Sequence, residues 1–326
     1  MNKLIGSLAL LVLTAATGYG GAPAPTLAIR EAWGNVFGGQ EAIFHIEIAA
    51  QTEFSGRMIW RLSAGDRTLW RNERSVRVEP GRTETVPINV RIPPVAPGVV
   101  YATRLTVEVA RDGDRKALAE VQRTIHAFPE EIFHEQTRRL AALEIYLFDP
   151  VGTTADRLQA AGVELTRVHN LDALEVLDRG VIIIGEGLDL REYRALPEIL
   201  MNRAAAGRTV LCLAPVDGAI TLAGANDAIQ PERILFRREK VIREWDKRLD
   251  ADAWSPDGRM VASGVNLQSY RGRVVGAIEA EGWPWLEMRF EGGGRLMVCG
   301  FAIMEKWESG PTPRFLFARL LESFAQ

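Results

Sequence analysis

Alternating apolar and polar residues dominate the chain from residue 26 to about residue 127. In the segment 42–48, Phe44, Ile46 and Ile48 lie on one face of an extended chain, and the residues between them lie on the other. One apolar and one polar face predict antiparallel strands that bury one side. The same period of two recurs at Met58, Trp60 and Leu62, at Val86, Ile88, Val90 and Ile92, and at Leu105, Val107 and Val109.

Turn-forming residues separate these predicted strands at short intervals. About seven short strands at this spacing predict an immunoglobulin-like (Ig-like) β-sandwich over residues 26–128. Pro129, followed by two glutamates, predicts the start of a linker helix over residues 129–142. The turn signals are Gly38-Gly39, Ala64-Gly65-Asp66, Glu79-Pro80-Gly81, the segment from Pro93 to Gly98, and Asp112-Gly113-Asp114.

The pattern changes from residue 143 onward, where short apolar runs alternate with helix-forming segments. The apolar run 181–185 fits a strand that is buried on both faces. Pro197 begins one predicted helix and Gly207 ends it. This alternation is typical of a parallel sheet whose strands are joined by helices, so we expect a mostly parallel α/β domain over residues 143–326. Residues 219–288 show no regular pattern.

Composition and charge narrow the range of partners. With 326 residues, of which 47% are hydrophobic, the chain is long enough for two domains with cores of their own. A formal net charge of −3 without a basic block argues against a nucleic-acid partner. The glycines 292–294 precede a predicted strand and lack a following Lys-Ser/Thr pair, so they predict a hairpin and not a phosphate-binding loop. We expect no cofactor.

The N-terminus predicts export. Lys3 precedes an apolar stretch from Leu4 to Ala16, which is too short to span a bilayer, and small residues follow it. Residues 1–22 are therefore expected to be a signal peptide, and the protein is expected to be periplasmic or secreted. An uncleaved anchor is the alternative, because Pro23 and Pro25 spoil two possible cleavage sites. We expect no transmembrane span after signal cleavage.

The chain has two cysteines, Cys212 and Cys299, which could form a disulfide or remain as free thiols. Both lie within apolar predicted strands, and side chains of neighbouring parallel strands rarely meet disulfide geometry. We therefore expect two buried free thiols that pack as small apolar groups. Neither cysteine has a partner at metal-ligand spacing, so no metal site is expected.

The segment 26–128 resembles Ig-like modules of secreted glycoside hydrolases. The resemblance rests on Asn35-Val-Phe-Gly-Gly-Gln-Glu41, on Arg77-Val-Glu-Pro-Gly-Arg82, and on the strands that follow each of them. Such modules are mostly spacers and packing partners. Trp33, Trp60 and Trp70 could stack on sugar, although Trp60 lies on the apolar face and is expected in the core.

The segment 143–326 resembles the class I glutamine amidotransferase superfamily, which has a flavodoxin-like fold. The resemblance rests on the segments Ile183-Ile-Gly-Glu-Gly187, Ala205-Ala-Gly-Arg-Thr-Val-Leu-Cys-Leu213, Glu291–Phe301, Glu305-Lys-Trp-Glu308 and Pro313–Leu321. It is most similar to versions that are attached to secreted bacterial β-galactosidase-type hydrolases and are regarded as non-catalytic.

The catalytic residues of that superfamily are missing. A nucleophilic cysteine needs a strained turn with flanking glycines, written G-x-C-x-G, which occurs nowhere in the chain. The late His-x-Glu pair is also absent, because His169 is the last histidine. The resemblance therefore implies a non-catalytic domain, and we expect no enzyme of the amidotransferase type.

Polar residues near the carboxyl ends of the predicted strands are the remaining candidates for a site. Ligands of open parallel sheets bind at these ends. Two acids and an aromatic ring could form a sugar site or an acid/base pair, and solvated loop residues are the alternative. The candidates are Asp149, His169, Glu186, Asp217, Glu305 and Trp307, together with Trp283 and Trp285 of an aromatic cluster.

The leading hypothesis is an exported, non-catalytic protein for binding or assembly, associated with polysaccharide handling. Its partner would be a polysaccharide or another envelope protein. The rival is a hydrolase of the glycosidase or esterase type, with Glu186 or Glu305 as general acid/base. A structural subunit of an envelope complex is the third possibility.

Overall fold

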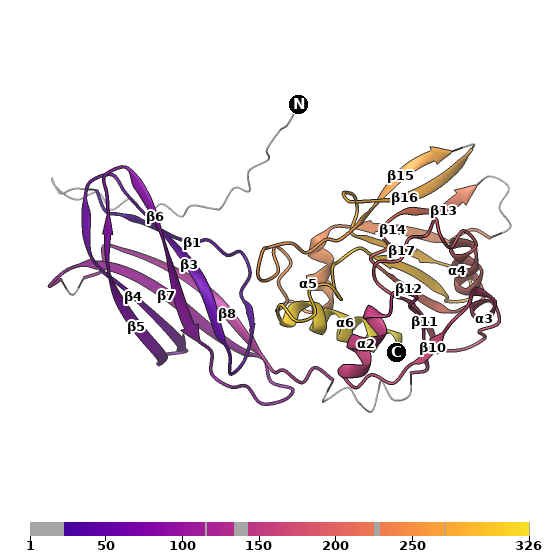
Figure 1. The fold of residues 1–326 in the computed structure, drawn as a ribbon, viewed down its shortest axis with the longest axis horizontal. Helices are drawn as coiled ribbons and strands as arrows, with labels where there is room; N and C mark the ends of the chain where they lie inside the picture. Colours follow the sequence, from indigo (N-terminus) through magenta and orange to yellow (C-terminus); the bar gives the residue numbers. More distant parts are fainter. Residues whose placement is uncertain (1–22, 115, 134–142, 225–228, 271, 326) are drawn as a thin grey trace.

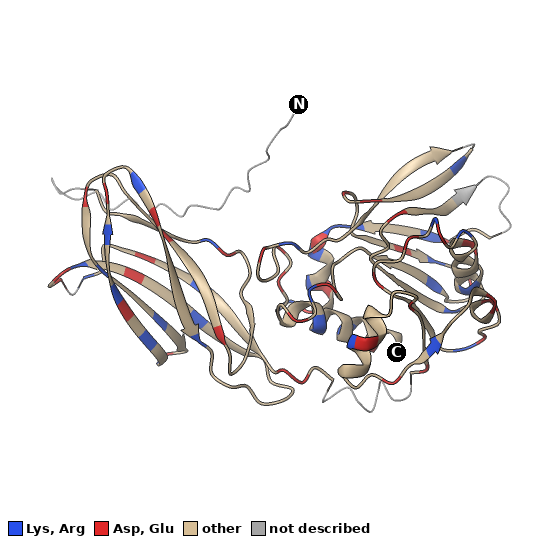
Figure 2. Cartoon of the chain, viewed as in Figure 1, with Lys and Arg blue, Asp and Glu red and all other residues tan. Residues whose placement is uncertain are grey.

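The computed structural model describes residues 23–114, 116–133, 143–224, 229–270 and 272–325 (Figure 1). Of the described residues, 44% lie in strands and 15% in helices, so the protein is mostly β. None of the helices in these ranges is both long and apolar enough to cross a bilayer. Lys and Arg are interspersed with Asp and Glu over both parts of the chain (Figure 2). The predicted signal peptide, residues 1–22, lies outside the described residues.

The first part of the chain forms two sheets around one apolar core (Figure 1). One has the strand order β1-β3-β6 and the other the order β2-β8-β7-β4-β5. All pairs are antiparallel except β2 with β8. The strands are β1 (Thr26–Ile29), β2 (Asn35–Phe37), β3 (Glu41–Ala50), β4 (Phe54–Ala64), β5 (Arg67–Val78), β6 (Arg82–Arg91), β7 (Tyr101–Arg111) and β8 (Ala119–Phe128).

The predicted alternation in this part is confirmed by burial. In β3 the side chains of Phe44, Ile46 and Ile48 are fully buried, while Ile43 is exposed. Trp60 lies in the core, as predicted, and its indole N–H donates to the carbonyl of Asn89 at 3.1 Å. The apolar residues of β4, β6 and β7 complete the same core between the sheets.

The second part is built on a seven-stranded sheet with the order β10-β9-β11-β12-β18-β17-β14. The strands from β10 to β18 in this order are parallel, whereas β17 pairs antiparallel with both of its neighbours, β18 and β14. A separate antiparallel sheet has the order β13-β16-β15. The strands are β9 (Ile145–Phe148), β10 (Thr166–Val168), β11 (Val181–Ile184), β12 (Thr209–Leu213), β13 (Gly218–Gly224), β14 (Arg233–Arg237), β15 (Gly264–Tyr270), β16 (Arg273–Glu279), β17 (Trp285–Arg289) and β18 (Arg295–Cys299).

Helices contribute to the cores on both faces of the seven-stranded sheet. One core cluster includes residues of α2, α5 and α6, and the other includes residues of α3, α4 and the small sheet. The helices are α2 (Thr153–Ala160), α3 (Leu171–Glu175), α4 (Leu196–Ala205), the 3₁₀ turn η1 (Glu239–Val241), α5 (Ile242–Trp245) and α6 (Pro311–Phe324).

The prediction of a flavodoxin-like, mostly parallel α/β domain is wrong. Five of the ten strands described in this part, β13 to β17, are antiparallel, and α3 and α5 have only five and four residues. The difference arises mainly in residues 219–288, where the sequence showed no regular pattern. There β16 alternates partly exposed and buried residues, with Gly276 and Ile278 buried, which is the signature of an antiparallel strand.

The predicted linker helix lies largely outside the described residues, which exclude 134–142. The described residues 129–133 contain bends, and Ile132 and Phe133 join Phe128 in the core of the second part. The helix, and with it the division into two domains at residues 129–142, stays a prediction.

The carboxylate of Asp250 and the side chain of Asn35 join the two parts. Oδ2 of Asp250 accepts the backbone N–H groups of Gly34 at 2.9 Å and Asn35 at 2.8 Å. The Asn35 side chain donates to the carbonyl of Arg248 at 3.1 Å and contacts the hydroxyl of Thr312 at 2.9 Å. A Cβ at Gly34 would lie 2.7 Å from the carbonyl oxygen of Thr124, so only glycine fits here.

Removing this acceptor is expected to destabilise the protein. Asp250→Ala leaves two buried N–H groups without a partner, at a cost of about 2 to 4 kcal/mol, measurable by urea unfolding. Asp250→Asn keeps one oxygen that can accept both bonds, so its stability should stay near that of the wild type. The exposed Asp252 provides the control, and Asp252→Ala should change little. Equal stability of the two alanine variants would contradict the role assigned to Asp250.

Candidate functional site

The carboxyl ends of the parallel strands carry two of the predicted acids. Asp149 follows β9, and its Oδ2 accepts the backbone N–H of Ala155 in the first turn of α2 at 2.8 Å. Its Oδ1 is buried and has no hydrogen-bond partner among the described residues. A Cβ at Gly185 would lie 2.3 Å from this oxygen, so the glycine after β11 lets Asp149 lie against the backbone. Asp149 therefore caps α2 beside the strand that leads to Glu186.

Glu186 links β11 to the loop after β18. Its two carboxylate oxygens accept the backbone N–H groups of Met304 at 2.6 Å and Glu305 at 2.7 Å. Its own N–H donates to the hydroxyl of Thr154 at 2.9 Å. Burial raises the pKa of Glu186 to about 7, although the two N–H groups and the charge of Arg157 act in the opposite direction. Such a group can exchange a proton near neutral pH.

The other predicted polar residues lie apart from Glu186 or at the surface. Glu305 is exposed and forms an ion pair with Arg259. Asp217 pairs with Arg191 at 3.0 Å. His169 is exposed, and within the described ranges no hydrogen bond or ion pair joins it to the other candidates. The structure thus brings Asp149, Glu186 and the backbone of Glu305 to one edge, but not Asp217 or His169.

The three predicted tryptophans differ in exposure. Trp285 and Trp307 are buried in the core, where they lie 6.0 Å from Trp245 and 6.0 Å from Phe317, measured between ring centroids. Trp283 is partly exposed, and the guanidinium of Arg238 lies 4.3 Å from the centroid of its ring. Of the three, only Trp283 has a surface that a ligand could reach.

The prediction of two buried free thiols is confirmed. Cys212 and Cys299 are both fully buried and not joined by a disulfide. Burial raises the pKa of each thiol to about 12, so neither is ionised near neutral pH. The residue after β12, Ala214, has a φ of 26°, a strained value for a non-glycine residue. The side chain at this strained bend is only the methyl group of Ala214, so the bend presents no nucleophile.

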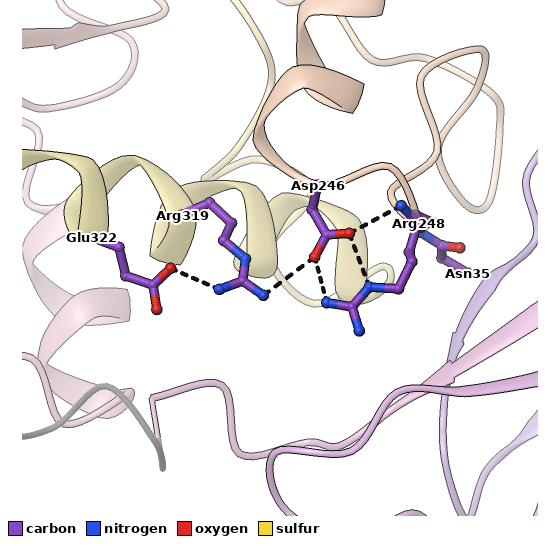
Figure 3. A network of polar contacts seen from close by, with 5 residues as sticks. All are labelled: Asn35, Asp246, Arg248, Arg319 and Glu322. Carbon is purple, nitrogen blue, oxygen red and sulfur yellow. Dashed lines mark hydrogen bonds and ion pairs between the residues drawn. The ribbon is translucent and has the colours of Figure 1, made fainter.

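Sequence analysis missed a cleft between the end of α5 and the last turns of α6. Its volume is about 570 Å³, within the usual range of small-molecule sites of ~300–1,000 Å³. α6 and the segment after α5 are far apart in sequence but lie side by side here (Figure 3). The cleft is lined by Trp245, Asp246, Lys247, Arg248, Arg319, Glu322 and Ser323.

Asp246 organises the polar residues of this cleft (Figure 3). Its two oxygens accept Nε and Nη2 of Arg248, at 2.9 Å and 2.6 Å, in a bidentate pair. One of them also accepts Nη2 of Arg319 at 3.3 Å, and Nη1 of Arg319 donates to Glu322 at 2.7 Å. Two guanidinium groups are thereby held on one carboxylate.

The charges of this network are fixed. Burial acts to raise the pKa of Asp246, but the hydrogen bonds and charge of Arg248 and the charge of Arg319 outweigh it, so the pKa is lowered. The hydrogen bond with Asp246 raises the pKa of Arg248. For Arg319, the contacts with Glu322 and Asp246 outweigh burial and raise the pKa. All three groups stay ionised at neutral pH.

Comparisons with known proteins show no family. No protein-family model matches the chain, and no curated protein matches it. Three solved structures illustrate what is similar. A cycloisomaltooligosaccharide glucanotransferase of Paenibacillus sp. is 10% identical, with 61% of this chain and 28% of that chain covered and a TM-score of 0.28.

The other two come from Bacteroides. A glycosyl hydrolase family 2 member of Bacteroides cellulosilyticus is 14% identical, with 59% of this chain and 32% of that chain covered and a TM-score of 0.25. A candidate β-galactosidase of Bacteroides fragilis is 9% identical, with 59% of this chain and 39% of that chain covered and a TM-score of 0.22. The chain spans less than half of each of these three structures, and such scores show neither a shared family nor a shared activity.

The pKa of Glu186 predicts a specific dependence of stability on pH. Because the native carboxyl binds its proton more tightly than the unfolded chain does, its stabilising contribution is complete below about pH 4.5 and is lost as the pH rises through 7. Relative to Glu186→Gln, the wild type should lose about 1 kcal/mol of unfolding free energy between pH 6 and pH 8. Urea unfolding at both pH values measures this difference. Glu192→Gln, at an exposed position, should show no such change, and a parallel course of wild type and Glu186→Gln would contradict the prediction.

Proposed function

We propose that this chain is an extracytoplasmic, non-catalytic binding protein whose ligand is a saccharide, and that the cleft beside Trp245 is its binding site. The observation that carries the proposal is the lining of this cleft. It combines an indole ring with two arginines and two carboxylates whose positions are fixed by their mutual contacts.

This lining suits a polyhydroxylated ligand. A sugar hydroxyl both donates and accepts hydrogen bonds, and the cleft offers an acceptor in Glu322 and donors in Arg248 and Arg319. The indole ring of Trp245 supplies apolar area, which fits the apolar face of a sugar ring. Side chains that are held in place before binding lose less entropy when the ligand arrives.

The non-catalytic part of the proposal is supported by the strand-end edge. Both oxygens of Glu186 are engaged by backbone N–H groups, and Glu305 is paired with Arg259. The two thiols are buried and protonated. Export is supported by the N-terminal pattern at residues 1–22, and residues 26–128 would act as a spacer that presents the cleft.

A glycan array tests this function. The full chain should bind a subset of glycans, and Arg319→Ala should reduce the signal at least about tenfold, because one lost charge-assisted hydrogen bond costs about 1.5 kcal/mol or more. Arg243→Ala is the matched control, since Arg243 is an exposed arginine near the cleft that pairs with Asp252 and does not line it. An array without bound glycans, or equal loss in both variants, would refute the proposal.

A second candidate function, hydrolysis by strand-end carboxylates, is favoured by one observation. The pKa of Glu186 near 7 is that of an effective general acid/base. Turnover of glycoside or ester substrates by the wild type, abolished in Glu186→Gln and retained in Glu192→Gln, would establish the hydrolase and displace the non-catalytic proposal. We expect no turnover.

A further inference from the structure

We infer that the cleft selects a saccharide unit that carries an anionic group, a carboxylate or a sulfate ester, and that Arg248 and Arg319 bind this group together. The inference rests on the proposed saccharide-binding function and narrows the class of ligand.

The two guanidinium groups are fixed in position before any ligand binds. Arg248 and Arg319 lie 71 residues apart in the chain, yet both donate to the carboxylate of Asp246. Nη1 of Arg248 makes no hydrogen bond within the described residues and points away from Asp246 (Figure 3). The planar guanidinium group thus keeps donors available for a second anion.

The cations of the network are more accessible than the anions. The side chains of Arg248 and Arg319 are 40% and 29% exposed, whereas those of Asp246 and Glu322 are 8% and 15% exposed. Lys247 adds a further exposed cation to the lining. Although the residues of the cleft include both signs of charge, the charge that an entering ligand meets first is therefore positive.

An anionic group fits this arrangement better than a neutral hydroxyl. Hydrogen bonds between arginine and a carboxylate or sulfate are charge-assisted and about twice as strong as neutral ones. Carboxylates of Asp246 and Glu322 keep the arginines oriented, so an anion can bind without a rearrangement of the side chains. A saccharide is preferred over an acidic peptide because Trp245 also offers an aromatic ring and Glu322 an acceptor for a hydroxyl.

Calorimetric titration of the full chain with four probes tests the inference. The probes are a tetragalacturonate, its methyl ester as the neutral form of the same sugar, an O-sulfated tetrasaccharide, and penta-glutamate as an acidic peptide. At least one anionic saccharide should bind about tenfold or more tightly than the methyl ester, and its affinity should fall with rising salt. Whether the acid or the sulfated probe binds identifies the anion.

Substitutions of the two arginines test whether they cause the preference for an anionic saccharide. Arg248→Gln/Arg319→Gln should abolish the preference, while Arg243→Gln should keep it. Because the double variant leaves Asp246 and Glu322 unpaired, Asp246→Asn/Arg248→Gln/Arg319→Gln/Glu322→Gln serves as a second variant in which all four residues of the network are neutral. A preference that survives in the neutral variant would overturn the inference.

The remaining outcomes of the titrations distinguish a failure of anion selectivity from a failure of saccharide binding. Equal affinity for tetragalacturonate and its methyl ester, with the sulfated probe no better, overturns the anion selectivity and leaves saccharide binding intact. Tighter binding of penta-glutamate than of any saccharide overturns the inference in favour of an acidic peptide. If no saccharide binds, the proposed function itself fails.

Discussion

The carboxylate of Asp250 is the contact on which the arrangement of the whole chain depends. It lies in a loop of the second part and binds two consecutive backbone N–H groups that begin β2 in the first part. Burial raises its pKa to about 6, although both N–H groups and the charges of Arg123 and Arg243 oppose the rise. The same oxygen therefore satisfies two buried donors at the contact between the two parts.

The walls of the cleft are connected to the contact at Asp250. Arg248 precedes Asp250 by two residues, and its carbonyl accepts the side chain of Asn35 while its guanidinium group pairs with Asp246. Asn35 also contacts Thr312 in the first turn of α6, the helix that carries Arg319. A residue of the sandwich thus ties together the two segments that form the walls of the cleft.

The alternation of apolar and polar residues predicted the sandwich strands. Each of these strands buries one face, so every second residue is apolar. The antiparallel strands β13, β15 and β16 were not recognised, since they lie in a segment where glycines and exposed apolar residues such as Leu267 blur the alternation. Asp149 and Glu186 could be placed at one sheet edge because each follows a strand of the parallel set. Asp246 and Arg319 could not, because a contact across 73 residues leaves no local pattern.

The two groups of polar residues differ in accessibility and in how tightly they hold their protons. Glu186 has a pKa suited to proton exchange, yet both of its oxygens hold the loop at Met304 and Glu305, which closes them to a substrate. Arg248 and Arg319 are accessible, and because their pKa values are raised, both stay charged near neutral pH. An accessible site with fixed charges can orient a charged ligand but cannot donate or remove a proton. Binding without chemistry is therefore the behaviour that this distribution of charge favours.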